Sequence, residues 1–485
     1  MSIQRFDTLI CGDDLSGLIA ANLLSYFNYK VVVLRDSFPA DRYQFNGYTL
    51  PVSPVLVPPL RFGDLLSQIR HYLSISQSEL EEESEFVEKF QYITSKLRVD
   101  IYVEKNDTIE EFYYELGVKR EISKKFITAV NLLMEELIEI YNKHIPYPPY
   151  SFWDKRKVKE SLFARFNSKE SPLCIFNDKK IPSIFKALLS FVVNADTNNI
   201  VPSQEAILGF LFLDKWLILP SLERLKSIFV KRLEERGNLV LYASDGNYQI
   251  EKRGFNYYLR DEKKQNSFRI DSVILSSDSN FLSKVISPKR FKSLNLENKI
   301  YYLRHTTNFV VNSSCIPEIA SKCIVLNKGT SDTVELSNLF QVSISKAMKG
   351  RAIVKENKVI SITTFVKPSI YNLKNSELLN KNALDALLSI FPFADEYIIN
   401  SSSVFDAEMF FDVNMNEVNK KTTYRFPHYL FAESTLKDGI LLYDMRTGIK
   451  NFVNAFSVFS PIGIFGDFMS AVRAAEIISK NIIGR

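Results

Sequence analysis

The 485-residue sequence predicts an α/β protein that opens with a Rossmann-type βαβ unit. Residues 8–11 form a short apolar run that ends at Gly12, and a second glycine follows at Gly17. Apolar residues then recur at helical spacing over 15–24, and a β-branched run occupies 31–34. Strand, tight turn, helix and strand therefore follow one another within about thirty residues, the length of one βαβ crossover.

The turn between the first strand and the helix carries an altered glycine motif. A dinucleotide-binding turn has the pattern G-x-G-x-x-G, whose middle glycine lets the backbone approach the diphosphate at the helix N-terminus. This chain has Gly12, Asp14 and Gly17 at the three glycine positions, with Ser16 before the last. Two like charges about 4 Å apart, at an effective dielectric near 20, repel by roughly 4 kcal/mol. Asp14 is therefore expected to weaken diphosphate binding on the order of a thousandfold, unless it turns away or a cation intervenes.

The end of the second strand is altered as well. An acidic residue normally binds the ribose hydroxyls there, but this chain has Arg35, and Asp36 comes one place later on the opposite face of the strand. Arg35 could meet a 2′-phosphate, as in NADP sites, or it could pair with a neighbouring carboxylate. Of these two interpretations we favour the ion pair.

Composition limits the classes of function that remain. Apolar residues make up 46% of the chain and charged residues 24%, as in an ordinary globular protein, and the net charge is only +5. Because there is no dense basic block, nucleic acid is not an expected partner. The chain has no run of 18 apolar residues, and its first strand begins near residue 8. These features predict a cytoplasmic protein without a transmembrane segment or a signal peptide.

Cysteines and histidines are few and far apart. Their spacing lacks the C-x-x-C and H-x-x-x-H patterns of metal sites, so we expect neither a metal site nor a disulfide framework. They are Cys11, Cys174, Cys315 and Cys323, and His71, His144, His305 and His428.

After the second strand, the sequence resembles flavoproteins of the phytoene desaturase and monoamine oxidase type. Those proteins continue with a G-G-R loop and a glycine–aromatic segment before the chain leaves the FAD domain. Here Arg42 keeps the arginine of the loop, Ala40 and Asp41 occupy the glycine places, and Gly47 with Tyr48 matches the next segment. The resemblance implies FAD as the cofactor, with Arg42 holding its phosphates.

A second block in the family order begins near residue 220. Ser221 is expected to cap a helix that Gly237 terminates. Strands are then expected at 239–242, 248–252, 255–260 and 270–275. The family has a glycine pair before this helix, close to the flavin, and this chain has Leu219 and Pro220 instead.

The third block lies at the C-terminus. Residues 461–466 lead into a helix expected over 467–478. In the family this turn points at the flavin, so the resemblance implies contacts from Gly463 and Gly466. The acidic residue that the family places before the turn falls here within 454–457, which reads Asn-Ala-Phe-Ser.

The order of the blocks predicts the domain organisation: a Rossmann-like FAD/NAD(P)-binding domain of the amine-oxidase and phytoene-desaturase type with an inserted α+β substrate domain. The Rossmann-like domain is expected to comprise 1–74, 216–290 and 426–485. The substrate domain is expected to comprise a mainly helical part, 75–215, and a sheet with one helix, 291–425.

The departures from the family pattern lie where FAD would contact the protein, at Asp14, Arg35, Leu219 and Asn454. We therefore expect a flavoprotein fold with a degraded FAD site, acting as a non-catalytic binding protein or partner subunit. Rab GDP-dissociation inhibitors are an analogy, because they resemble these oxidases and bind prenylated partners without catalysis. The expected ligand is an apolar, isoprenoid- or lipid-like molecule, or a protein docked on the surface.

The alternative is an active FAD-dependent oxidoreductase, desaturase- or amine-oxidase-like, acting on a bulky apolar or amine substrate. A third hypothesis is another nucleotide held by Arg35. No residue is assigned a catalytic role, and Tyr48 and His428 are expected to be structural. Contact with a membrane surface and the oligomeric state are left open. If FAD binds, its contacts are expected from Gly12, Ser16, Gly17, Arg42, Gly463 and Gly466.

Overall fold

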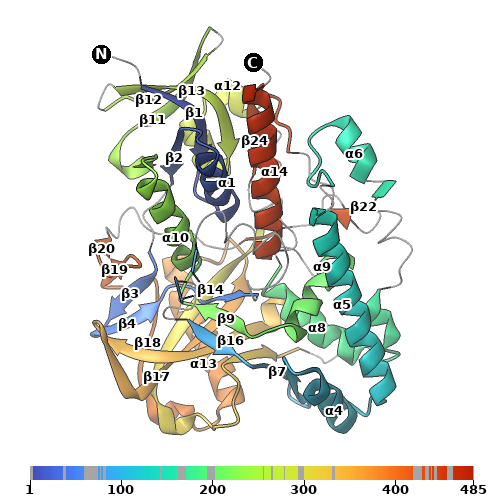
Figure 1. The fold of residues 1–485 in the computed structure, drawn as a ribbon. Helices are drawn as coiled ribbons and strands as arrows, with labels where there is room; N and C mark the ends of the chain where they lie inside the picture. The colour runs from blue at the N-terminus through green and yellow to red at the C-terminus, as the bar shows by residue number, and fades with distance from the viewer. Residues whose placement is uncertain are drawn as a thin grey trace.

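The computed structural model describes most of the chain. The described residues are 4–36, 40–58, 75–76, 78–79, 84–142, 145–158, 160–161, 171–193, 202–254, 256–263, 266–277, 279–292, 300–329, 334–418, 429–431, 436–437, 440–441, 445–455 and 463–483. The sequence also predicts an amphipathic helix over about 63–73, and both this segment and the predicted structural residue His428 lie outside the described residues. Figure 1 shows a Rossmann-like part beside both termini, a larger β-rich part below it, and the helices of 105–190 at one side.

The first sheet has 7 strands and contains the predicted βαβ unit. Its parallel strands lie in the order β10-β2-β1-β13, β24 also pairs with β13 in parallel, and β12 and β11 continue the sheet in antiparallel fashion. The strands expected in these regions are confirmed. Their bounds are β1 (Gln4–Cys11), β2 (Val31–Arg35), β10 (Leu239–Tyr242), β11 (Tyr248–Arg253), β12 (Asn256–Asp261), β13 (Asn266–Leu275) and β24 (Phe452–Asn454).

Helices cover both faces of the parallel strands, which explains why these strands are apolar along their whole length. Val31 and Val33 pack in the cluster that includes α1, α10 and α14, whereas Val32 and Leu34 pack in the cluster that includes α11. Alternate residues of one strand thus enter two different cores. The helix bounds are α1 (Leu15–Tyr26), α10 (Leu222–Glu235), α11 (Ser279–Val285) and α14 (Gly463–Ile483).

The second sheet has 12 strands, with a central path β18-β14-β17-β16-β4-β3-β19-β20. It is covered in part by α13 (Ser376–Ile390). Off this path, β15 pairs with β16 and β7, β8 pairs with β7, and β21 pairs with β14. The bounds are β3 (Arg42–Phe45), β4 (Tyr48–Pro51), β7 (Lys89–Ile93), β8 (Arg98–Tyr102), β14 (Ile300–Asn312), β15 (Cys323–Asn327), β16 (Leu339–Lys349), β17 (Ala352–Val366), β18 (Ile398–Ser403), β19 (Met409–Phe411), β20 (Glu417–Val418) and β21 (Tyr429–Phe431).

The hairpin β3–β4 differs from the expected domain organisation, because it lies within 1–74 but pairs in the second sheet. Its turn is Asn46–Gly47, with φ of +47° and +76°. Two positive φ values in an Asn-Gly pair are typical of a tight hairpin turn. Thr49 of β4 then pairs with Met348 of β16. The chain therefore joins the second sheet shortly after β2.

The remaining elements lie outside the two large sheets. A 3-stranded sheet has the order β5-β9-β6, and β22 pairs with β23. Among the described residues, no helix combines the length and the apolar character needed to cross a membrane. The bounds are β5 (Val55–Val57), β6 (Glu85–Val87), β9 (Trp216–Leu219), β22 (Leu436–Lys437), β23 (Ile440–Leu441), α4 (Lys105–Leu116), α5 (Arg120–Asn142), α6 (Phe152–Val158), α8 (Lys180–Ser190), α9 (Pro202–Glu205) and α12 (Pro288–Phe291).

A buried carboxyl group in α9 makes stability depend on pH. Glu205 is 0% exposed and accepts a hydrogen bond from Ser171 Oγ. Burial raises the pKa of Glu205 to about 7, against the smaller lowering effects of Ser171 and Lys186. Between its ordinary value of 4.5 and about 7, the folded state therefore holds the proton more tightly than the unfolded state. The stability from this proton is fully present below pH 4.5 and is lost as the pH rises toward 7.

We predict that Glu205→Gln removes this part of the pH dependence. Between pH 5 and 8, the free energy of unfolding of the unmodified protein should fall by about 3 kcal/mol more than that of the variant. Urea denaturation at several pH values measures the difference. Glu121→Gln, at an exposed site on α5, is the control and should keep the slope. Equal slopes for the unmodified protein and Glu205→Gln would contradict the prediction.

Candidate functional site

The predicted glycine turn joins β1 to α1 at the carboxyl edge of the first sheet. Gly12 has a φ of +111°, and a Cβ at this position would lie 2.1 Å from Ser276 O. A Cβ at Gly17 would lie 2.2 Å from Ser276 Oγ. The backbone N of Asp14 donates to Ser276 O at 3.0 Å. The turn is therefore closed tightly against Ser276, the residue that follows β13.

Asp13 and Arg35 form a buried ion pair beside this turn. Arg35 Nη2 and Nε lie 2.9 and 3.2 Å from Asp13 Oδ2, and Arg35 Nη2 lies 2.8 Å from Glu223 Oε2. The two side chains of the first pair are 1% and 5% exposed. Burial alone would lower the pKa of Arg35, but Asp13 and Glu223 outweigh it and raise the pKa. The predicted pairing of Arg35 with a carboxylate is confirmed.

Lys226 adds a second cation from α10. Its Nζ lies 2.9 Å from Glu223 Oε1, and its side chain is 11% exposed. Burial lowers the pKa of Lys226, but Asp13, Glu223 and Asp14 together raise it above its ordinary value. A cation is thus present near Asp14, as diphosphate binding there would require, but two other carboxylates share it. We call Asp13, Arg35, Glu223 and Lys226 the corner cluster.

A second group of charges adjoins the corner cluster at the start of α10. Asp41 is 0% exposed and accepts hydrogen bonds from Ser221 Oγ at 2.7 Å and from Arg224 Nη2 at 3.2 Å. Arg42 Nε lies 3.5 Å from Asp41 Oδ2. Ser221 Oγ also accepts from Glu223 N at 3.1 Å, which confirms the predicted helix cap. Asp41, at one of the family's glycine places, therefore binds both arginines.

The C-terminal block meets the glycine turn through Ser16, whose Oγ donates to Ala455 O. Asn454 is 3% exposed, and its Oδ1 has no hydrogen-bond partner among the described residues. Gly463 begins α14 with a φ of +64°, and a Cβ there would lie 2.2 Å from Val192 O. Gly466 lies further along α14. Among the described contacts, none connects Gly463 or Gly466 with the corner cluster.

The residues at the corner do not fit the adenosine diphosphate half of FAD. A diphosphate needs open backbone amides and positive charge at the start of α1. Instead, Asp13, Asp14 and Glu223 outnumber Arg35 and Lys226, and the two cations already contact carboxylates. Ribose hydroxyls need an acceptor at the end of β2, where Arg35 offers only donors. At the other end of the site, the buried Asn454 Oδ1 remains an acceptor that a hydroxyl group could satisfy.

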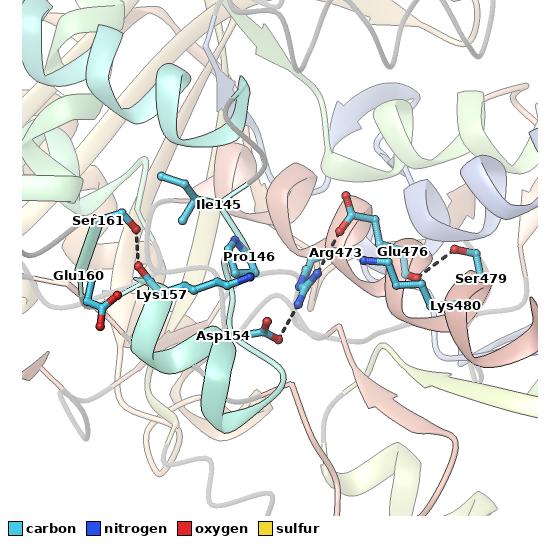
Figure 2. A pocket seen from close by; sticks show the side chains of 10 residues that line it. All are labelled: Ile145, Pro146, Asp154, Lys157, Glu160, Ser161, Arg473, Glu476, Ser479 and Lys480. Carbon is cyan, nitrogen blue, oxygen red and sulfur yellow. Dashed lines mark hydrogen bonds and ion pairs between the residues drawn. The ribbon is translucent and has the colours of Figure 1, made fainter. Parts of the chain in front are cut away.

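The described residues form at least two hollows outside the corner. A cleft of about 860 Å³ separates α6 and its flanking residues from α14 (Figure 2). One ion pair crosses the cleft, since Arg473 Nη2 of α14 lies 2.6 Å from Asp154 Oδ2 of α6. Arg473 Nη1 also lies 3.0 Å from Glu476 Oε2 on the same helix. A cavity of about 310 Å³ is lined by residues of β3, β4, β6, β9, β16 and β17, among them Arg42 and Leu219. No group of three or more metal-ligating side chains occurs in the described part of the chain.

Most of the corner cluster was not predicted from the sequence. Asp14 and Arg35 were expected at the site, but Asp13, Glu223 and Lys226 were not. A signal was available, because α10 precedes β10 and runs against it, which places the first turn of α10 at the carboxyl edge of the sheet. Since β10 lies parallel beside β2, Glu223 and Lys226 arrive next to the last residue of β2.

Comparison with known proteins supports the fold. No protein-family model and no curated protein sequence matches the chain. Among solved structures, putrescine oxidase bound to putrescine matches with a TM-score of 0.56 and 14% identity, over 99% of both chains. A protein from Pyrococcus furiosus matches with a TM-score of 0.54 and 13% identity over 98% of this chain and 97% of that one. An oxidoreductase from Methanosarcina mazei matches with a TM-score of 0.53 and 12% identity over 97% and 100%.

These likenesses extend over nearly the whole length of each chain, so they include the inserted domain as well as the Rossmann-like part. The predicted fold class, an α/β flavoprotein fold with an inserted α+β domain, is confirmed. This chain therefore has the same fold as putrescine oxidase, as the resemblance predicted.

Proposed function

We propose that this protein is a non-catalytic binding protein, or a partner subunit, that has kept the amine-oxidase fold and lost its FAD site. One observation carries the proposal. Asp13, Arg35, Glu223 and Lys226 form a closed, charge-balanced cluster at the corner where the resemblance places the diphosphate and ribose of FAD.

The energetics support this proposal. Opening the corner cluster would leave buried charges unpaired, and breaking a buried ion pair costs about 3–5 kcal/mol. A diphosphate at the start of α1 would also meet the carboxylate of Asp14, at a further cost of roughly 4 kcal/mol. Together these costs would consume most of the binding free energy of a micromolar ligand, which is about 8 kcal/mol.

The cavity of about 310 Å³ is the place that we propose for an apolar ligand or an inserted group of a partner protein. Its volume is at the lower end of the range for small-molecule sites. Ile218, Leu219 and Met348 contribute apolar walls. The cavity would therefore accept a segment of an isoprenoid or acyl chain, or an apolar side chain of a docked protein.

The alternative is an FAD-dependent oxidoreductase that acts on an amine or a bulky apolar substrate. Two observations favour it. The likeness to putrescine oxidase covers 99% of both chains, and the buried Asn454 Oδ1 is an unused acceptor in the C-terminal block. FAD would then have to bind with its diphosphate displaced from the start of α1.

We predict that the purified protein is colourless and stays so after incubation with excess FAD and removal of the free flavin. An absorbance spectrum tests this, because bound flavin absorbs near 375 and 450 nm, at about one flavin per chain if every site is filled. Putrescine oxidase carried through the same steps is the positive control. Stoichiometric flavin bands in the spectrum would overturn the non-catalytic proposal and favour the alternative.

A further inference from the structure

A second buried arginine lies far from the corner cluster, on β14 of the second sheet. Arg304 is 4% exposed, and its Nη2 donates to Phe191 O at 2.7 Å. Its guanidinium carbon lies 5.9 and 5.6 Å from the ring centroids of Phe191 and Phe365. Those two rings stack on each other with their centroids 4.8 Å apart. Among the described residues, the guanidinium therefore contacts two aromatic rings and one carbonyl oxygen.

No carboxylate among the described residues contacts Arg304, in contrast to the two that hold Arg35. Burial lowers the pKa of Arg304 to about 10, and no acidic neighbour offsets this effect. A guanidinium has five N–H donors, and the one hydrogen bond that Arg304 makes among the described residues leaves most of them unused. Contacts with ring faces offset only part of the cost of burying a charge. The positive charge of Arg304 is thus only partly compensated by its described neighbours when no ligand is bound.

Arg304 lies near the place where the two parts of the fold meet. It pairs across the strands with Phe365 of β17, while Phe191 directly follows α8. The next residue, Val192, supplies the carbonyl that packs against Gly463 at the start of α14. In Figure 1, α14 runs from this junction up beside α1, and β14 and α8 lie below it. Arg304 therefore lies close to the buried interface between the second sheet and the C-terminal helix α14.

We propose that Arg304 binds the carboxylate of an apolar organic acid, whose hydrocarbon part lies against Phe191 and Phe365. A carboxylate matches the fork of guanidinium donors and neutralises the buried charge. The ring faces supply apolar contact for the rest of the ligand. Neither Arg304 nor the two rings are among the described residues that line the cavity of about 310 Å³. The inference therefore goes beyond the proposed function to a second site, and it shares with that function only the apolar character of the ligand.

The first test is the stability of Arg304→Met without ligand. Replacing an under-compensated buried charge by an apolar side chain of similar length is neutral or stabilising. We expect the midpoint of thermal unfolding of Arg304→Met to equal or exceed that of the unmodified protein. A fall as large as that of Arg35→Met would show that the Arg304 guanidinium stabilises the fold without a ligand, and it would overturn the proposal.

The second test is the binding of decanoate and of 4-phenylbutyrate to the flavin-free protein, measured by isothermal titration calorimetry. At least one of these acids should bind, and its neutral alcohol analogue should bind at least tenfold more weakly. Arg304→Met should lose about tenfold to a hundredfold in affinity for the acid. Arg156→Met, at an exposed site, should keep the affinity.

The proposal of a lost FAD site and the assignment of Arg304 to a carboxylate can be contradicted independently. Heat from carboxylate binding does not depend on flavin, so a protein that takes up FAD can still pass or fail this test. If neither acid binds, or if Arg304→Met binds them as well as the unmodified protein does, the assignment of Arg304 is overturned. A spectrum without flavin bands leaves that result unchanged.

Discussion

Arg35→Met is expected to lower the free energy of unfolding by about 3–5 kcal/mol, because it replaces the guanidinium that contacts both Asp13 and Glu223 by an apolar side chain, and Lys226 still contacts only Glu223. The Asp13 side chain is 5% exposed and that of Glu223 is 18% exposed, so water can replace little of the lost interaction. Urea denaturation followed by circular dichroism measures the change. An effect of this size would be a large fraction of the stability of an ordinary domain.

The control is Arg156→Met, the same substitution in an exposed pair. Arg156 and Glu160 are 63% and 62% exposed, so the pair should contribute less than about 1 kcal/mol. The double variant Asp13→Asn/Arg35→Met should recover part of the loss, since it also removes the charge of the buried Asp13 carboxylate that Arg35 contacts. A loss below about 1 kcal/mol for Arg35→Met would mean that the corner is hydrated and open, and such a corner could accept FAD.

The fold could be predicted from the sequence because its signals are local. The apolar runs of β1 and β2, the helical stripe of α1 and the cap at Ser221 each depend on residues close together in the chain. The order of three such blocks then indicated a known architecture. The Asn46–Gly47 turn was an equally local signal, and it would have placed β3 and β4 in a hairpin.

The candidate site could be predicted only in part, because its partners are distant in sequence. Arg35 is 188 residues from Glu223, and the two meet only because β10 lies parallel beside β2. Spacing within the glycine motif drew attention to Asp14. The ion pair forms instead through Asp13, the neighbouring residue whose side chain points into the protein. Which of two adjacent carboxylates is buried depends on packing that the motif does not specify.

The largest steric effect is expected at the turn itself. Gly12→Ala should lower the free energy of unfolding by about 2–4 kcal/mol, from the left-handed backbone and from overpacking against Ser276 O. Gly117→Ala is the matched control, because Gly117 has a φ of +67° but nothing within 4 Å of its added Cβ. It should cost only about 1 kcal/mol, again measured by urea denaturation.

Asp14→Gly completes the comparison, because it restores the glycine of the nucleotide motif. Asp14 has an extended backbone with φ of −62° and makes no side-chain cap to α1, so the change should cost only a few tenths of a kcal/mol. Close packing against Ser276 therefore explains why positions 12 and 17 are glycines, whatever the protein binds. The middle glycine of the general motif, which Asp14 replaces here, serves only the approach of the diphosphate. If Gly12→Ala were as mild as Gly117→Ala, packing would not explain why the first glycine is present, and a bound nucleotide would be the better explanation.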